Sequence, residues 1–438
     1  MDALRELKSE KWFKKRNDLY TFKQTDDFKN TTKPTLRDFR SSLISDEFLS
    51  FLTSITNIEF NGNIDLAGQH YQRGGNLLCH DDELDGRRIA FIWYLVDPSW
   101  SEKDGGEFCL YGNDGGQPEV DYCNKVVPEW NMVVFFETTP TTWHQVAEVL
   151  SNQDRYTISG WFHGSVIPRP PFLAEPPVPE LLLDQLPSGF QIADYIDPQY
   201  LVEETQNLLK KRFGKDSSIG LCDFLKQEKY DLIFNELRSS QWKVIGPPTR
   251  RYYGSLGRPK GERETGEVLQ LKNFLKSKEM ILFLQKITGL KIIASEEGEV
   301  RCFSAQNYTL VHDNEHQHKT FGLDLSLGFQ DPALEWDDEF GGYTTYMDEK
   351  TELIALPPQP NVLCLVYRDV GCMKFVKFLT SQSPCKHYDF INTFKTLDEG
   401  DDEEDEEDDQ DEDSEEDEEP EQLDEDQEQQ EDPEGQQD

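Results

Sequence analysis

Apolar residues first recur at helical spacing between residues 35 and 57, after a polar N-terminal stretch. This spacing is typical of an amphipathic helix, and we expect a break in it near Ser45. The apolar positions are Leu36, Phe39, Leu43, Phe48, Phe51, Leu52 and Ile55. From Ile64 the pattern changes to short apolar runs that are separated by Gly and Asn, which favours strands over helices.

Four short apolar runs predict strands, at 89–96, 107–111, 131–136 and 156–162. The first run is continuous enough for a buried central strand, and Asp97-Pro98 ends it. Many short strands at close spacing favour an all-β barrel or jelly roll with a helical cover. We therefore expect a mainly β, α+β fold.

Prolines cluster between residues 166 and 180. Because proline removes hydrogen-bond donors and stiffens the chain, we place a semi-rigid linker at 168–198. Apolar positions at helical spacing then predict a helical region over 201–234.

The chain repeats its own motifs at a constant distance. Residues 51–56 (FLTSIT) are echoed by 283–288 (FLQKIT), and 283 − 51 = 232. Residues 78–83 (LCHDDE) are echoed by 310–315 (LVHDNE) at the same spacing, because 312 − 80 = 232. An Asp-Pro pair and a Gly-Gly pair follow in the same order in both halves. We therefore predict two copies of the same fold, which we place at 1–167 and 199–397.

The histidine and aspartate of the first echoed motif suggest a metal site. His80 and Asp82 stand two residues apart, so on a strand they share one face and can reach one ion. His144 is the third predicted ligand. Two histidines and one carboxylate, with open positions opposite, are how non-haem Fe(II) oxygenases hold iron. A lone His-x-Asp is common, and a lone histidine is often structural. The order of these residues, their setting on predicted strands and their selective loss in the second copy together favour a metal site.

Arg155, eleven residues after His144, is the predicted anchor for an organic acid that binds the same iron. The distal carboxylate of a 2-oxoacid needs a permanent cation with bidentate geometry, which arginine provides and lysine does not. Thr157 shares the face of Arg155, and the phenol of Tyr94 on the central strand can reach the same carboxylate. The alternatives are a surface ion pair of Arg155 with Asp154 and a core aromatic role for Tyr94.

The second copy differs where this chemistry would sit. Asn314 stands in place of Asp82, Lys374 aligns with His144, and no arginine falls where Arg155 would align. Because a protonated lysine repels a cation, we expect no catalytic iron in the second copy. Shaping substrate access or recruiting partners is the role we expect instead.

Negative charge is concentrated at the C-terminal end. The formal net charge is −42, but residues 398–438 hold 28 Asp or Glu and no Lys or Arg. The remainder carries 86 − 28 = 58 acids against 44 bases, or −14. The tail has too few apolar residues to fold, and we expect it to be disordered. An acidic surface attracts basic protein and argues against direct binding of nucleic acid.

Eight scattered cysteines form no C-x-x-C pair, which favours reduced thiols and a cytosolic or nuclear protein. The N-terminus carries no signal-peptide pattern. The longest apolar run, 89–96, is far shorter than the about 20 residues that cross a bilayer. We expect a cytoplasmic and nuclear protein with no membrane partner.

These motifs resemble those of the two-domain ribosomal prolyl 3-hydroxylases and their yeast relatives, within the 2-oxoglutarate- and Fe(II)-dependent oxygenase superfamily. The resemblance covers the chain from about residue 18 to about 397. Its carriers are 77–83 (LLCHDDE), 86–91 (GRRIAF), 143–150 (WHQVAEVL) and 158–164 (ISGWFHG).

The resemblance implies two tandem double-stranded β-helix (jelly-roll) domains, the first catalytic and the second not. It implies Fe(II) at His80, Asp82 and His144 and 2-oxoglutarate at Arg155 and Tyr94, with ascorbate in support. The implied reaction is hydroxylation at C3 of a proline in the basic small-subunit ribosomal protein near the decoding centre. The implied consequence is an effect on translation termination or accuracy, with termination factors as further partners.

The three ligands determine the oxidant and leave the substrate open. A lysyl hydroxylase, or a demethylase of histone or nucleic acid, would use the same cofactors. A non-catalytic scaffold for translation factors is a third hypothesis, and the intact His80, Asp82, His144 and Arg155 argue against it.

Overall fold

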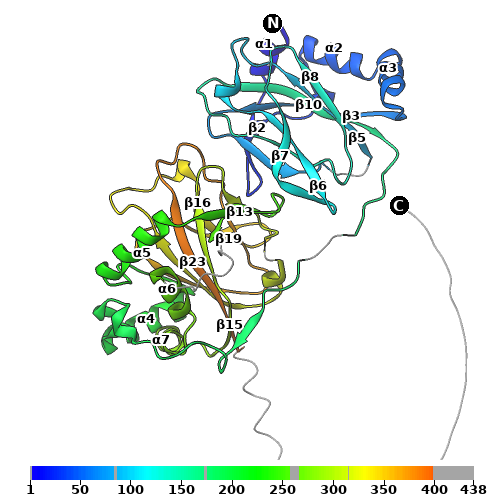
Figure 1. Cartoon of the computed structure of the whole chain (residues 1–438). Helices are drawn as coiled ribbons and strands as arrows, with labels where there is room; N and C mark the ends of the chain where they lie inside the picture. The colour runs from blue at the N-terminus through cyan, green and yellow to red at the C-terminus, as the bar shows by residue number, and fades with distance from the viewer. Residues whose placement is uncertain (1, 83–85, 172–174, 257–265, 314, 398–438) are drawn as a thin grey trace, which may run out of the picture. The chain divides into compact units, whose positions relative to one another are not determined.

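The computed structural model describes residues 2–82, 86–171, 175–256, 266–313 and 315–397, without the side chain of His318 (Figure 1). The described residues are mostly β-sheet with some helices, consistent with a jelly-roll oxygenase fold. No helix among them is long and apolar enough to cross a membrane. The acidic tail lies outside the described residues, so its disorder stays a prediction.

The described strands before residue 165 belong to one antiparallel sheet, in the order β7-β6-β9-β4-β2-β3-β10-β5-β8, with β1 paired to β2. Each of the four predicted strands is present, as β5, β6, β8 and β10, whereas the β1–β2 hairpin was not predicted. The bounds are β1 Phe13–Arg16, β2 Tyr20–Gln24, β3 Phe60–Tyr71, β4 Asn76–His80, β5 Arg87–Tyr94, β6 Phe108–Asp114, β7 Gln117–Val126, β8 Val133–Glu137, β9 His144–Val146 and β10 Arg155–Gly164.

β10 is paired with β3 along one edge and with β5 along the other. Its two faces carry different kinds of side chain. Successive side chains of a strand point to opposite sides of the sheet. Tyr156, Ile158 and Phe162 belong to the apolar core beneath the helices. The opposite face of the strand carries Arg155, Thr157, Ser159 and Trp161, each of which has a hydrogen-bonding group in its side chain. The alternation along one strand thus separates the core from the candidate site.

The close packing of β3 against β10 requires a glycine. A Cβ on Gly160 would lie 1.8 Å from the main-chain carbonyl oxygen of Asp65 on β3. Any side chain at this position would therefore push the two strands apart and disturb the residues on both sides of it.

Helices cover the apolar side of this sheet, and Figure 1 shows them beside β8 and β10. The core cluster joins Leu36 and Leu52 of two of these helices to Phe91 of β5. The break predicted near Ser45 is confirmed, because its hydroxyl accepts a hydrogen bond from the main-chain nitrogen of Phe48 at 3.2 Å and caps the next helix. The helices are α1 Asp2–Lys8, α2 Pro34–Leu43 and α3 Asp46–Thr56.

The described strands after residue 175 form a second antiparallel sheet of ten strands and a separate sheet of three. The path of the larger sheet is β12-β21-β18-β23-β16-β14-β13, with β11, β15 and β17 attached, and the smaller sheet is β20-β19-β22. The bounds are β11 Glu180–Leu182, β12 Ser218–Leu221, β13 Trp242–Ile245, β14 Arg251–Leu256, β15 Ile292–Glu296, β16 Glu299–Phe303, β17 Tyr308–Thr309, β18 Gly322–Phe329, β19 Thr344–Met347, β20 Glu352–Leu356, β21 Leu363–Arg368, β22 Met373–Val376 and β23 His387–Thr396.

Helices α4 to α7 share one apolar core with the larger of these sheets and lie on the same side of β16 and β23 (Figure 1). The region predicted to be helical over 201–234 contains α4 and the start of α5, with β12 between them. The bounds are α4 Glu203–Asp216, α5 Gln227–Ser239, α6 Glu267–Leu275 and α7 Lys278–Thr288, and the short 3₁₀ helices are η1 Phe28–Asn30, η2 Glu102–Asp104, η3 Ile192–Asp194, η4 Pro198–Leu201, η5 Glu315–Lys319 and η6 Asp338–Phe340.

The segment predicted as a linker at 168–198 is not free of regular structure. β11 pairs antiparallel with β15 and places Leu181 opposite Ser295. Residues 180–182 contain no proline, so every main-chain nitrogen in this short stretch can donate a hydrogen bond. The middle of the segment therefore joins the second sheet.

The repeat predicted from the sequence is matched by two helices. Ser45 precedes α3 and Ser277 precedes α7, at a spacing of 277 − 45 = 232, and both hydroxyls cap their helix at 3.2 Å. The second echo differs, because His80 ends β4 whereas His312 lies in a turn. Two tandem copies of one fold therefore stay a prediction.

Candidate active site

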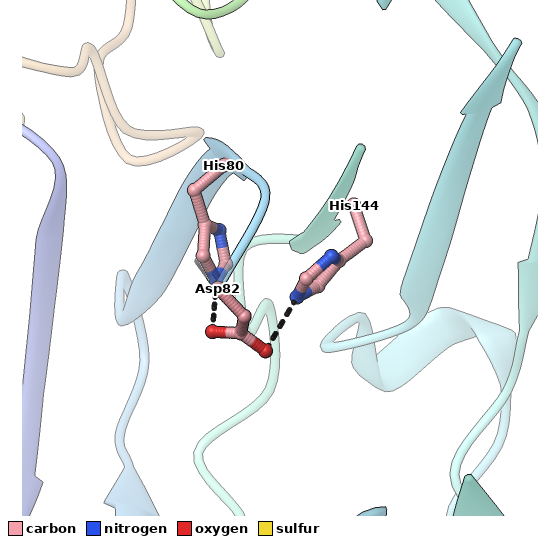
Figure 2. A group of neighbouring side chains, drawn as sticks. All are labelled: His80, Asp82 and His144. Atoms are coloured by element: carbon pink, nitrogen blue, oxygen red, sulfur yellow. Dashed lines mark ion pairs between the residues drawn. The ribbon is translucent and has the colours of Figure 1, made fainter. Parts of the chain in front are cut away.

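The three predicted ligands converge at the ends of two paired strands. His80 ends β4, His144 begins β9, and the two residues are register partners in this antiparallel pair. Figure 2 shows both rings facing the carboxylate of Asp82, with His80 Nε2 and His144 Nε2 each 3.2 Å from one of its oxygens. One ligand atom from each residue lies within 4.8 Å of the others, which suits a single small cation.

Asp82 reaches this position from a turn and not from a strand. β4 ends at His80, and the backbone of Asp82 is left-handed, with a φ of 58°. Our expectation that His80 and Asp82 share one face of a strand is therefore wrong. The left-handed backbone at this residue places its carboxylate beside the two rings.

Hydrogen bonds from Nδ1 to the main chain fix the orientation of both imidazoles. Nδ1 of His80 lies 2.8 Å from the carbonyl oxygen of Leu78, and Nδ1 of His144 lies 2.9 Å from that of Thr142. A carbonyl oxygen only accepts, so each Nδ1 carries the hydrogen and donates it. Nε2 of each ring then faces the centre, which is the arrangement that metal-binding histidines commonly have.

The electrostatics of the group keep the aspartate ionised. Burial raises the pKa of Asp82, but hydrogen bonds from His144 and His80 outweigh burial and hold the pKa well below its usual value. Burial lowers the pKa of His80, and the adjacent Asp82 more than offsets this, so the pKa is raised. Asp82 therefore carries a negative charge that a divalent cation can balance, and a bound cation takes the place of the ring protons that face this carboxylate.

Arg155 lies fully buried at the start of β10 with most of its donors unused. Its Nε donates to the carbonyl oxygen of Gly106 at 2.9 Å, while Nη1 and Nη2 have no hydrogen-bond partner. The rings of Tyr71 and Tyr94 lie 4.9 and 5.1 Å from the guanidinium carbon. A buried cation without a partner is costly, so this edge of the guanidinium fits a carboxylate that the protein itself does not provide.

Two further buried donors lie beside this guanidinium. The hydroxyls of Tyr94 and Thr157 also have no hydrogen-bond partner, and the two residues are register partners on β5 and β10. Burial raises the pKa of Tyr94, so the phenol keeps its proton and can donate. The predicted trio of Arg155, Tyr94 and Thr157 thus forms one polar lining that suits an anionic organic acid.

One alternative that the sequence left open, an ion pair of Arg155 with Asp154, is not observed in the part of the chain that the structure describes. Asp154 pairs with Nε2 of His70 at 2.9 Å, and no ion pair joins it to Arg155 among the described residues. His70 and His163 both pair with carboxylates outside the triad, and Nε2 of His163 lies 3.1 Å from Asp65.

The sequence reasoning missed residues that line the same site. Trp161 donates its indole N–H to Oδ2 of Asp82 at 3.1 Å, and the guanidinium of Arg87 lies 3.6 Å from the centre of the indole ring. Tyr71 flanks Arg155. The signal for Trp161 was available, because it lies on the face of β10 that Arg155 and Thr157 share.

The second half carries a different set of charges. Lys374 Nζ lies 2.8 Å from Oδ2 of the buried Asp324, and Arg368 Nε lies 3.4 Å from the same oxygen. Asn314 lies outside the described residues. The exposed His312 pairs with Glu315 at 2.9 Å. Among the residues that the structure describes, the metal-binding arrangement of side chains is found in the first half alone.

Two family models match the chain. Residues 66–163, which contain all six predicted site residues, match the 2OG-Fe(II) oxygenase superfamily. Residues 190–404 match the C-terminal domain described as oxoglutarate and iron-dependent oxygenase degradation C-term. Fe(II) and 2-oxoglutarate are therefore the cofactors of this enzyme, and the His80, Asp82 and His144 cluster suits the metal.

The chain is similar to curated proteins over most of its length. It is 38% identical to prolyl 3-hydroxylase OGFOD1 of Xenopus laevis over 87% of this chain and 81% of that one. It is 33% identical to prolyl 3-hydroxylase OGFOD1 of Mus musculus over 86% and 81%. A Pseudomonas putida prolyl-4-hydroxylase matches 37% of this chain and 84% of its own, at 18% identity and a TM-score of 0.31, too weak a likeness for further argument. The two relatives and the oxygenase model together show that the chain belongs to the prolyl 3-hydroxylase family of 2-oxoglutarate- and Fe(II)-dependent oxygenases.

Proposed function

We propose that this enzyme hydroxylates C3 of a proline in a basic small-subunit ribosomal protein near the decoding centre, and so affects translation termination or accuracy. The observation that carries the catalytic part is the convergence of His80, Asp82 and His144 beside the unpaired guanidinium of Arg155. The relatives named prolyl 3-hydroxylase support the choice of proline and of C3. Ascorbate is a supporting reductant in this proposal.

The reaction replaces a proline C–H bond by C–OH, and one oxygen molecule and one 2-oxoglutarate are converted to that hydroxyl, succinate and CO2. The bound iron supplies the oxygen and electron-transfer chemistry. His80, Asp82 and His144 hold the metal through fixed ligand atoms. Arg155, Tyr94 and Thr157 bind the distal carboxylate of 2-oxoglutarate, and their burial excludes water from that end of the site.

The choice of a basic protein as substrate rests on charge. Residues outside the tail carry 58 acids against 44 bases, and the tail adds 28 acids. An acidic enzyme attracts basic proteins at long range and repels nucleic acid, so we propose no direct contact with RNA. Translation termination factors are further proposed partners. Activity in the cytoplasm and nucleus is part of the proposal, in line with the eight free cysteines.

We further propose that residues 1–167 and 199–397 are tandem jelly-roll domains, the first catalytic and the second a degenerate copy. Helices α3 and α7 are separated by 232 residues (278 − 46), the same spacing as the echoed sequence motifs, which supports a common origin of the two halves. The pairing of Lys374 with Asp324 supports the loss of metal binding in the second half. Its role would then be to shape substrate access or to recruit partners.

Turnover of 2-oxoglutarate by the purified full chain tests this function, with Fe(II), ascorbate and a panel of peptides from small-subunit ribosomal proteins. Tandem mass spectrometry should place one added oxygen on a proline, and NMR of the product should place it at C3. Oxygen added to lysine, or loss of methyl groups from histone or nucleic acid, would replace this proposal with one of the alternatives. Succinate release that persists in His80→Ala would contradict the metal site. No turnover by the unchanged chain with any of these substrates would favour the scaffold hypothesis.

A further inference from the structure

The carboxylate of Asp82 has a neighbour that is not one of the proposed ligands. The indole N–H of Trp161 donates to Oδ2 of Asp82 at 3.1 Å, from the face of β10 that also carries Arg155. An indole has one donor, no acceptor and no proton to lose at physiological pH. It can therefore fix the orientation of this carboxylate without competing for the metal.

The main chain of the same aspartate is held by a second residue. Nη1 of Arg87 lies 3.4 Å from the carbonyl oxygen of Asp82, whose φ of 58° is a conformation that residues with side chains rarely adopt. The guanidinium of Arg87 also lies 3.6 Å from the centre of the Trp161 ring, which is a cation–π contact. Arg87 thus contacts both the strained turn and the back of the indole that orients its side chain.

The sheet brings these residues together by register. On β10, Trp161 is the register partner of Asp65 on β3, and His163 is the register partner of Arg87 on β5. Asp65 in turn lies 3.5 Å from Nη2 of Arg87 and 3.1 Å from Nε2 of His163. Asp65 of β3 and Trp161 of β10 therefore both contact the guanidinium that β5 carries.

We propose that Trp161 and Arg87 are positioning residues that orient the Asp82 carboxylate for metal binding. This inference rests on the proposed metal site and concerns how that site is built. Trp161 acts on the carboxylate, and Arg87 acts on the turn and on the indole. Residues that orient metal ligands in this way typically contribute about 10- to 100-fold to metal affinity.

Metal binding to the full chain, without peptide or oxygen, tests the proposal. Trp161→Phe removes the N–H and keeps an aromatic ring beneath Arg87, and Arg87→Met keeps part of the stem and removes the guanidinium. We expect each variant to bind Mn(II) about 10- to 100-fold more weakly, by electron paramagnetic resonance of the free ion. The visible spectrum of bound Co(II) should also change, since a reoriented carboxylate alters the ligand field.

Trp93→Phe is the matched control. Trp93 lies on β5, and its indole donates to Oδ1 of Asn131 at 3.1 Å, away from the triad. The Trp93→Phe variant should bind Mn(II) with the affinity of the unchanged chain. Circular dichroism and thermal unfolding identify any variant that does not fold. If Trp161→Phe or Arg87→Met fails to fold, the metal affinity of the remaining variant tests the proposal.

An unchanged Mn(II) affinity and Co(II) spectrum in folded Trp161→Phe would overturn the proposal. A raised KM for peptide with unchanged metal affinity would overturn it as well, and would make Trp161 a substrate contact. A failure of the proposed ribosomal substrate leaves these measurements intact, because neither uses peptide. Loss of Mn(II) binding in His80→Ala shows that the proposed metal site itself is being measured.

Discussion

Gly106 and Arg155 fit each other closely. The carbonyl oxygen of Gly106 accepts the hydrogen bond from Arg155 Nε at 2.9 Å, and a Cβ on Gly106 would lie 2.8 Å from Arg155 Cδ. The glycine thus turns one donor of the guanidinium toward the main chain and leaves Nη1 and Nη2 free for a carboxylate. This contact joins the second residue of the Gly-Gly pair to an arginine that lies 49 residues further along the chain.

Arg155→Lys should raise the KM for 2-oxoglutarate about 10- to 100-fold, because a charge-assisted hydrogen bond contributes about 1.5–3 kcal/mol. Lysine keeps the charge and loses the planar pair of donors. Steady-state turnover at varied 2-oxoglutarate measures this, with Arg73→Lys as a control at an arginine outside the lining. An unchanged KM in Arg155→Lys would exclude Arg155 as the anchor.

Gly106→Ala should weaken 2-oxoglutarate binding by displacing the guanidinium. Gly62→Ala is its control, because the φ of Gly62 is 81° and that of Gly106 is 70°, so both backbones are left-handed. A Cβ added to Gly62 would have no atom within 4 Å. Both variants should lose about 1–2 kcal/mol of stability from the left-handed backbone. Calorimetric titration of 2-oxoglutarate onto the Mn(II) form should distinguish them, and equal affinities would contradict the Gly106–Arg155 relationship.

2-Oxoglutarate should stabilise the folded chain, because it pairs donors that are otherwise buried without partners. At about 100 times its Kd a ligand adds about 2.7 kcal/mol to the free energy of unfolding. Thermal unfolding of the Mn(II) form with and without 2-oxoglutarate measures the rise in melting temperature. Arg155→Gln should abolish most of it, and a rise that survives in this variant would place the ligand elsewhere.

The full chain should bind one catalytic metal ion. His80→Ala or Asp82→Ala should remove it, whereas His312→Ala should not, because His312 is exposed and Lys374 supplies a positive charge to Asp324 in the second half. Titration with Co(II) followed by absorbance gives the stoichiometry. A second tight ion that depends on His312 would contradict the loss of metal binding there.

Acid should destabilise the second half through His387. Burial lowers the pKa of His387 from 6.5 to about 4, although the nearby Asp389 raises it and Arg301 lowers it further. The unfolded chain binds a proton below pH 6.5 and the folded chain does not, so stability present above pH 6.5 is lost as the pH falls to about 4. The full loss is on the order of 3 kcal/mol.

Urea unfolding between pH 4 and 7 measures this loss as the difference between the unchanged chain and His387→Phe. Phenylalanine can keep the stacking on Phe303, whose ring centre lies 5.0 Å away, and it does not titrate. The variant should show a shallower dependence on pH, whereas His312→Gln should behave as the unchanged chain. Parallel curves for His387→Phe would show that another group causes the acid sensitivity.

Sequence patterns predicted well those features that depend on neighbours along the chain. The alternation in β10 and the apolar run of β5 follow from the period of a strand, and Ser45 marks a helix start through a local hydrogen bond. Motif chemistry predicted which residues carry the right atoms, because few residue types bind a metal or a carboxylate. The hairpin of β1 and β2 was missed because its strands are polar and depend on pairing.

The sequence by itself determined the ligand types and the strands that carry most of them. Only the tertiary structure decided that His80 and His144 face each other, that Asp82 arrives from a left-handed turn, and that Trp161 and Arg87 stand behind it. These relationships depend on which strands pair and in what register. Register is set by packing between segments far apart in the chain, and no local pattern encodes it.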